Sequence, residues 1–266
     1  MTTTEDFLAL HHGDRPLLLP NPWDAGSARI LASLGFAALA TTSGGFAATL
    51  GRPDGAVSSD EAIDHAAAIV AAVGVPVSAD LENGFADAPE AVADTVRAAI
   101  AAGLAGCSIE DSTRNPDAPV YDAAFARDRI QAAAGAAHAG GHQLVLTARA
   151  ENYLYDRTDL ADTIARLQSY QEAGADVLYA PGLTAAADIA TLLAEVERPV
   201  NVLLLPGGPS LAELADLGVH RISVGGALAY AAYGALAEAA GGLLAGSADF
   251  WPQVRAGRTA ARGAFG

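Results

Sequence analysis

A helical stretch that ends at a glycine and leads into a short apolar run recurs along the chain. Four copies are plain, with Ala/Leu-rich segments that reach Gly35, Gly103, Gly174 and Gly218. Glycine ends a helix at low cost in the left-handed conformation. A continuous apolar run is typical of a strand that is buried on both faces. The repeat therefore predicts steps from a helix into a parallel strand.

Eight apolar runs of this kind follow one another, and each pair is separated by a segment with one helical pattern. The runs are 17–19, 37–40, 75–79, 106–109, 144–148, 176–179, 200–205 and 221–224. Eight strands that alternate with helices favour a closed (β/α)8 TIM-type barrel over an open doubly wound sheet, which usually has fewer strands. A further helix is expected over residues 227–240.

The composition suits one large folded unit. The chain has 266 residues, of which 52% are apolar and 17% charged, so it can bury a sizeable core, and disordered or coiled-coil chains are excluded. We expect a barrel domain over residues 1–240 and a C-terminal helical tail over residues 241–266 that could exchange between subunits. The aromatic pair Phe250 and Trp251 in this tail would pack on a partner subunit or on the barrel itself. A homo-oligomer, a dimer or tetramer, is our hypothesis.

The net charge of −16 disfavours nucleic acid and anionic membranes as partners, because both attract clustered cations. The first residues lack the basic and apolar regions of a signal peptide, and the single Cys107 cannot close an intrachain disulfide. We therefore expect a cytoplasmic protein. The most membrane-like stretch, residues 225–247, carries Glu238 in its middle, which favours a packed helix of a soluble protein.

No lysine occurs in the chain, so all fifteen basic residues are arginines. Enzymes that form a Schiff base through lysine are excluded, as are pyridoxal-phosphate enzymes and P-loop nucleotidases. The six histidines show no metal-ligand spacing with one another or with Cys107, so zinc is not expected.

Charged side chains follow three consecutive expected strands. Asp80 and Glu82 come after the third, Glu110 after the fourth and Arg149 after the fifth. The carboxyl ends of the strands carry the functional residues of such barrels, and converging carboxylates favour a hard divalent cation. The pattern predicts Mg²⁺, or Mn²⁺ in its place, with an arginine beside it to hold a small carboxylate substrate. A purely structural ion-pair network of these four side chains is the alternative.

Five motifs between about Pro20 and about Gly234 resemble the isocitrate lyase and phosphoenolpyruvate mutase superfamily. They are residues 21–28 (NPWDAGSA), 42–44 (TSG) with 50–54 (LGRPD), 79–85 (ADLENGF), 108–111 (SIED) and 147–151 (TARAE). The resemblance implies this barrel, a tetramer that exchanges a C-terminal helix between subunits, and Mg²⁺. It also implies chemistry at a carbon-carbon or carbon-phosphorus bond next to a 2-oxo or 2-hydroxy acid.

The resemblance also assigns the metal site. It implies that Asp80 binds the cation directly and that Glu82 and Glu110 hold its water molecules. Glu82 stands where the family often has aspartate, and the extra methylene could change direct ligation to ligation through water.

The same resemblance assigns the substrate site. It implies that a backbone loop cradles the carboxylate and oxo group of the substrate, and the residues of this loop are Thr42, Ser43 and Gly44. Arg149 would anchor and polarise the substrate, and Asp54 matches the mobile-loop aspartate that is the nucleophile in the phosphonate enzymes. We also expect Asn115, on the loop after the fourth strand, to contact the substrate.

Two segments of this chain differ from the family's sequences, and the differences reduce the number of activities to be expected. The isocitrate and methylisocitrate lyases carry a Lys-Lys-Cys-Gly-His segment after the fourth strand, where this chain has residues 111–116 (DSTRNP). The phosphonate mutase has a lysine on that loop and a histidine after the sixth strand, where this chain has residues 180–182 (APG). The sequence therefore disfavours lyases that need the thiol acid, and it also disfavours mutase activity.

The expected function is cleavage of a small 2-oxo or 2-hydroxy dicarboxylate through an enolate held by Mg²⁺ and Arg149. The group that moves the proton stays open among Asp54, Ser112, Arg114, Asn115 and Tyr179. One alternative is a phosphonopyruvate-type hydrolase or mutase that uses Asp54 as its nucleophile. The other is a barrel that binds 2-oxo acids without turning them over.

Overall fold

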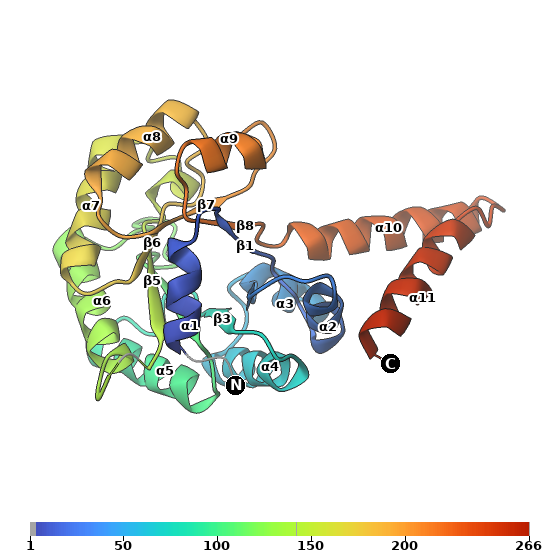
Figure 1. Cartoon of the computed structure of the whole chain (residues 1–266), viewed down its shortest axis with the longest axis horizontal. Helices are drawn as coiled ribbons and strands as arrows, with labels where there is room; N and C mark the ends of the chain where they lie inside the picture. Colours follow the sequence, from blue (N-terminus) through green and yellow to red (C-terminus); the bar gives the residue numbers. More distant parts are fainter. Residues whose placement is uncertain (1–3, 142, 266) are drawn as a thin grey trace.

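Eight parallel strands alternate with helices in the computed structural model, which describes residues 4–141 and 143–265 (Figure 1). The strands are β1 Leu17–Leu19, β2 Leu39–Ala40, β3 Val77–Asp80, β4 Gly106–Glu110, β5 Val145–Arg149, β6 Val177–Tyr179, β7 Val200–Leu203 and β8 Arg221–Ser223. Each strand falls on one of the eight apolar runs.

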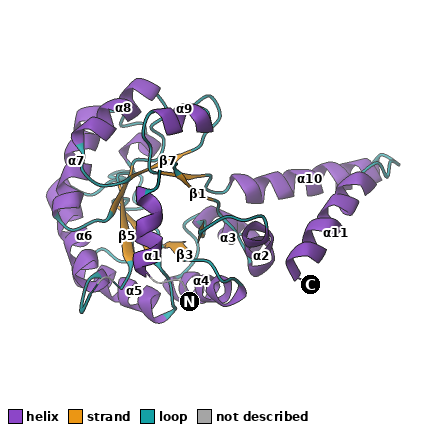
Figure 2. Ribbon diagram, in the orientation of Figure 1, coloured by secondary structure: helices purple, strands orange, loops and turns teal. Residues whose placement is uncertain are grey.

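The strands close into a barrel. Neighbours pair in the order β1-β8-β7-β6-β5-β4-β3-β2, and the remaining seam carries a backbone hydrogen bond of 3.1 Å from Ala40 N to Pro20 O. Figure 2 shows the strands at the centre and the helices around them. The predicted (β/α)8 barrel is confirmed.

The helices that surround the strands are α2 Ala25–Ser33, α3 Ser43–Thr49, α4 Ser59–Ala72, α5 Pro89–Ala101, α6 Ala123–Ala137, α7 Leu160–Glu172, α8 Ala186–Glu195 and α9 Leu211–Asp216. A short 3-10 helix, η2 Asn152–Tyr155, follows β5. The four glycines of the repeat, Gly35, Gly103, Gly174 and Gly218, have φ values of 95°, 81°, 105° and 85°. They end helices in the left-handed conformation that the sequence pattern predicts.

Alternate positions of each strand face opposite sides of the barrel wall. The larger apolar cluster lies between strands and helices and includes Leu81, Ile109, Leu146, Leu178 and Ile222. A smaller cluster fills the amino-terminal end of the barrel interior. The remaining interior positions hold the polar residues of the site described below.

An N-terminal segment covers the amino-terminal end of the barrel. It consists of α1 Thr4–Ala9 and the 3-10 helix η1 Leu10–His12, and Figure 1 shows α1 across the barrel opening. Phe7 is fully buried in the smaller cluster. A Cβ atom on Gly106 would lie 2.8 Å from the Phe7 ring, so only glycine fits at the start of β4.

Two C-terminal helices form an arm. Helix α10, Ala227–Leu244, leaves the barrel, and α11, Trp251–Phe265, turns back towards α2 (Figure 1). The expected helix over residues 227–240 is present, but it continues past residue 240. Its one buried residue is Ala229, so the packing expected for this helix is not present in the single chain. Within the described residues, α10 is the one helix whose length and composition would allow a membrane span, which on its own is weak evidence for one.

Candidate active site

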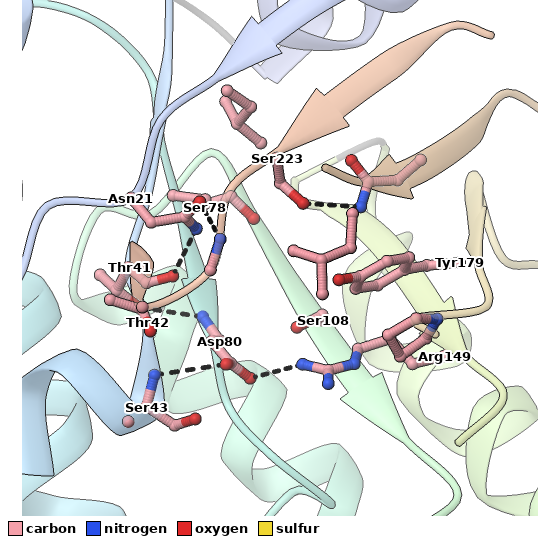
Figure 3. A pocket seen from close by; sticks show the side chains of 18 of the residues that line it. Asn21, Thr41, Thr42, Ser43, Ser78, Asp80, Ser108, Arg149, Tyr179 and Ser223 are labelled. Atoms are coloured by element: carbon pink, nitrogen blue, oxygen red, sulfur yellow. Dashed lines mark hydrogen bonds and ion pairs between the residues drawn. The ribbon is translucent and has the colours of Figure 1, made fainter. Parts of the chain in front are cut away.

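A polar cavity of about 200 Å³ opens at the carboxyl ends of the strands. Side chains from opposite sides of the barrel line it, and Figure 3 shows Asp80 and Arg149 joined by an ion pair at its wall. The expected site residues that line this cavity are Thr42, Ser43, Gly44, Asp54, Asp80 and Arg149. The structure therefore brings together six residues that come from four separate segments of the chain.

Asp80 is the last residue of β3 and is held from three sides. Its Oδ2 atom accepts a hydrogen bond from Ser43 N at 3.3 Å, and its own N–H donates to Thr41 Oγ1 at 2.9 Å. Its Oδ1 atom lies 3.1 Å from Nη1 of Arg149. These contacts fix the carboxylate between the loop after β2 and the end of β5.

The loop after β2 turns directly into α3. Thr42 is the residue that caps the helix, and its hydroxyl accepts a hydrogen bond from Gly45 N at 3.3 Å. A Cβ atom on Gly45 would lie 2.5 Å from Cγ2 of Thr42, so the turn requires glycine. A Cβ atom on Gly44 would lie 3.2 Å from Oδ2 of Asp54, which places that carboxylate beside the loop.

Arg149 ends β5 in the middle of a group of carboxylates. Its guanidinium lies 3.1 Å from Asp80, 3.3 Å from Glu110 and 2.9 Å from Glu151. Its carbon CZ also lies 5.1 Å from the centre of the Tyr179 ring. Burial by itself lowers the pKa of Arg149, but the three carboxylates outweigh it and raise the pKa well above its ordinary value. The guanidinium is therefore a permanent cation at the cavity wall.

Carboxyl groups outnumber cations at this end of the barrel. Asp80, Glu82, Glu110 and Glu151 face two guanidinium groups, because Arg114 forms an ion pair with Glu82. Burial raises the pKa of Glu82 to about 7, against the opposing effect of Arg114. Burial, followed by repulsion from Glu151, also raises the pKa of Glu110. The site therefore holds more carboxyl groups than its arginines can neutralise, and Glu82 and Glu110 retain protons at higher pH than ordinary glutamates.

This excess bears on the expected metal site. The donors Asp80, Glu82 and Glu110 offer only oxygen atoms, which suits a hard divalent cation in charge and in chemistry. In the structure, however, Glu82 is turned towards Arg114 and Glu110 towards Arg149. Among residues 4–141 and 143–265, no three acidic, histidine or cysteine side chains are close enough to hold a metal ion together. The donor chemistry fits, while each of the three carboxylates is paired with an arginine in this structure.

Asn115 does not line the cavity. It lies on the exposed loop after β4, and its side chain accepts a hydrogen bond from Asp117 N at 3.0 Å within that loop. The neighbouring Ser112 bonds to the hydroxyl of Tyr155 at 2.8 Å. Of the five groups considered for proton transfer, only Asp54 and Tyr179 line the cavity.

Several cavity residues were missed in the sequence. Asn21 joins three segments, because its side chain donates to Thr41 O at 3.1 Å and accepts from Val224 N at 3.0 Å and Gly225 N at 2.9 Å. Its place directly after β1, inside one of the quoted motifs, was a usable signal. Tyr230 and Arg221 also line the cavity, and no local pattern marks either one.

A buried arginine outside the cavity holds the loops that carry the acidic groups. Arg129 of α6 is fully buried and donates to backbone carbonyls of the loop after β3 and to the carbonyl of Glu110. Its guanidinium lies 4.2 Å from the centre of the Tyr121 ring. Arg129 therefore positions the loops without touching the cavity.

Comparison with known proteins agrees with this geometry. The family model described as phosphoenolpyruvate phosphomutase matches residues 7–244. Among curated proteins, an oxaloacetate decarboxylase of Pseudomonas savastanoi is 32% identical over 79% of this chain and 73% of its own length. The 2-methylisocitrate lyase of Escherichia coli is 30% identical over 70% of this chain and 64% of its own length.

Solved structures show the same likeness. A provisionally named lyase/mutase from Burkholderia cenocepacia is 55% identical and superposes with a TM-score of 0.88, covering 90% of this chain and 87% of its own. A 2,3-dimethylmalate lyase is 28% identical with a TM-score of 0.84, covering 94% and 90% of the two chains. The named relatives are lyases and mutases that act on small carboxylic acids. The resemblance noted in the sequence is thus confirmed, and the chain belongs to the phosphoenolpyruvate mutase and isocitrate lyase superfamily.

Proposed function

We propose that this protein is a Mg²⁺- or Mn²⁺-dependent lyase that cleaves a carbon-carbon bond of a small 2-oxo or 2-hydroxy dicarboxylic acid through an enolate. The observation that carries the proposal is the position of Arg149, which pairs with Asp80 at the wall of a small polar cavity. The relatives named oxaloacetate decarboxylase and 2-methylisocitrate lyase support this substrate class.

Arg149 is the group that stabilises the enolate. A guanidinium has five N–H donors, so its fork can serve a substrate oxygen as well as its carboxylate partners. Negative charge that develops on the substrate oxygen is stabilised most by donors already held in place, and three carboxylates hold this guanidinium. The substrate carboxylate is assigned to the loop of Thr42, Ser43 and Gly44.

Asp80 would hold the divalent cation, with Glu82 and Glu110 at its water molecules after release from their arginines. The bound cation would supply Lewis acidity at the 2-oxo oxygen. For the proton, the cavity offers Tyr179 and Asp54. Burial raises the pKa of Tyr179 to about 12, so its hydroxyl keeps a proton that it can donate towards an enolate.

Turnover of a substrate panel tests the proposal. Oxaloacetate, methylated malates, 2-methylisocitrate and phosphonopyruvate are incubated with Mg²⁺ or Mn²⁺, and the products are identified by mass spectrometry. We expect cleavage of at least one dicarboxylate, and its loss when a chelator removes the metal. No product from any of these acids with either metal would refute a catalytic function and leave a 2-oxo acid binder.

The variant Arg149→Ala tests the contribution of this arginine to turnover. We expect its kcat/KM to fall by roughly 10²- to 10³-fold, the usual effect of removing one such donor. Arg97→Ala is the matched control, because Arg97 is exposed and forms only a surface ion pair with Asp94, and it should keep normal turnover. Near-normal activity of Arg149→Ala would contradict the assignment.

One observation favours a second candidate function. The carboxylate of Asp54 lies beside Gly44 and lines the cavity, where it could attack the phosphorus of phosphonopyruvate. Release of free phosphate from phosphonopyruvate, lost in Asp54→Asn, would establish a carbon-phosphorus hydrolase in place of the lyase.

The proposal includes a cytoplasmic homo-oligomer, a dimer or tetramer, with no nucleic acid or membrane partner. The exposed apolar side chains of the C-terminal arm support self-association. The net charge of −16 supports the absence of polyanionic partners.

A further inference from the structure

The interior of this barrel is unusually polar below the site. Barrels of this type commonly fill that space with layers of branched apolar side chains. Here the cavity continues downward between small and polar side chains, and these are Ser78, Ser108, Asn201, Arg221 and Ser223. The volume that valine or isoleucine would occupy is therefore open to a ligand.

Arg221 lies at the floor of this space. It is the first residue of β8 and its exposed fraction is 4%. Its Nε atom donates to Asn201 Oδ1 at 2.9 Å and its Nη2 atom donates to Thr147 Oγ1 at 3.0 Å. Its Nη1 atom lies 3.2 Å from Nε2 of His11. All three partners are neutral groups.

His11 is neutral because of its own surroundings. Burial, followed by the nearby charge of Arg221, lowers its pKa to about 3. Its Nδ1 atom lies 2.9 Å from Phe7 O, so the hydrogen-bond network assigns the proton to Nδ1 and leaves Nε2 to accept from Arg221. His11 thus orients the guanidinium without neutralising it.

No counter-ion accompanies Arg221. Within the described ranges 4–141 and 143–265, it forms no ion pair with an aspartate or glutamate, whereas Arg149 has three such partners and Arg166 has two. Burial lowers the pKa of Arg221 to about 10, and Arg149 contributes by repulsion. A buried charge without a partner is costly, and an anion in the cavity would remove that cost.

We propose that Arg221, with Asn201 and Ser223, forms a second anion subsite at the cavity floor that receives the distal carboxylate of the substrate. The inference rests on the proposed function, because it takes the 2-oxo end to lie against the paired side chains of Asp80 and Arg149. Both arginines line one cavity of about 200 Å³, which is small for a ligand pocket. A short chain with an anionic group at each end matches a cavity with a cation at each end.

Direct binding tests the subsite independently of turnover. Succinate and butyrate have the same chain length, and their affinities are compared by calorimetry. We expect the protein to prefer succinate by about tenfold or more, since a buried charge-assisted pair contributes at least that much. Arg221→Gln should abolish this preference and leave butyrate affinity within about threefold, and Arg198→Gln, which changes an exposed arginine, should change neither.

Asn201→Asp keeps the test decisive if Arg221→Gln does not fold. This isosteric change places a carboxylate at the position that now lies 2.9 Å from Nε of Arg221, so the protein supplies its own counter-ion. We expect a folded protein with an unchanged or higher Tm and no preference for succinate.

Two results would overturn the subsite. One is a succinate preference that survives both Arg221→Gln and Asn201→Asp. The other concerns chloride: it raises the Tm of the wild type as much as succinate does, and the effect disappears in Asn201→Asp. That result would show that the cavity floor binds an inorganic ion. Neither result depends on catalysis, so a protein that binds succinate as described but turns over no acid would refute the proposed function alone.

Discussion

Two arginines inside the barrel are stabilised in opposite ways. Arg149 is surrounded by three carboxylates, while Arg221 is held by an amide, a hydroxyl and an imidazole. The first keeps its charge through ion pairs. Arg221 depends on neutral acceptors. A protonated His11 would place a second positive charge beside its guanidinium and would destabilise the folded state.

This dependence predicts acid sensitivity. The pKa of His11 is lowered to about 3 in the folded protein, against about 6.5 in an unfolded chain. The unfolded state therefore binds a proton first, and the free energy of unfolding should fall as the pH drops from about 6.5 to about 3, by up to roughly 4 kcal/mol from this group. Urea unfolding at a series of pH values measures this loss.

His11→Gln should make the loss between these pH values smaller, because glutamine can accept from Arg221 and does not titrate. His12→Gln is the matched control at an exposed neighbour and should follow the wild type. Equal pH dependence in His11→Gln and the wild type would show that His11 is not the group responsible.

The positions of residues at the ends of strands could be predicted from the sequence. Asp80 and Arg149 could be placed in the site because parallel strands bring their carboxyl ends to one face. Arg221 could not, because it begins its strand and only the inward direction of its side chain brings it to the cavity. Asn115 failed for the opposite reason, since its loop folds on itself and away from the cavity.

At the scale of elements, the loops after β3 and β4 depend on one helix. Arg129 of α6 donates to the carbonyls of Ala86, Asp87 and Glu110. No local pattern predicts this, because the arginine lies about forty residues from the first loop in a helix with a weak apolar stripe. These three hydrogen bonds, and a fourth to the carbonyl of Asn83, therefore hold together the loops that carry the acidic residues.

Arg129→Leu should lower the free energy of unfolding by about 3 kcal/mol or more, because it leaves buried carbonyls without donors. Arg127→Leu is the matched control, since Arg127 is partly exposed and lies 3.9 Å from its only ion-pair partner, Asp128, among the described residues. It should change the free energy of unfolding by less than about 0.5 kcal/mol. Similar values for the two variants in chemical denaturation would contradict the role of Arg129.

The eight strands were predictable because glycines in the left-handed conformation end helices just before buried apolar runs.

The length of α10 was not predictable from the sequence. The helix was expected to end at residue 240, but it continues through Gly241 and Gly242 to Leu244, and the left-handed residue is Gly246 with a φ of 84°. A glycine permits the end of a helix without requiring it.

At the scale of the whole molecule, the arm of α10 and α11 leaves apolar surface uncovered. Leu236, Leu243 and Leu244 are 63%, 57% and 93% exposed, and Trp251 is 52% exposed. Exposed apolar side chains gathered on one element mark an interaction surface. They support the predicted exchange of the tail over residues 241–266, which stays a prediction.

The double variant Leu236→Glu/Leu244→Glu should reduce the molar mass in solution to that of one chain, because two charges would be buried in the interface. Light scattering after size exclusion measures the mass. Leu34→Glu is the matched control, because Leu34 is 69% exposed and lies on the barrel, and it should leave the mass unchanged. A monomeric wild type would remove the oligomer from the proposal.

Helix α10 also reaches the cavity at its other end, where Tyr230 forms part of the wall and its hydroxyl lies 3.6 Å from the position of a Cβ atom on Gly44. In the proposed oligomer, a neighbouring chain would contact the outer turns of α10, while a ligand in the cavity contacts Tyr230 at its first turn. Both would then act on the same helix. Their binding free energies are then coupled, and thermodynamic reciprocity requires the same factor in both directions. In the proposed oligomer, ligand affinity should therefore depend on protein concentration, and binding measured at two protein concentrations checks this.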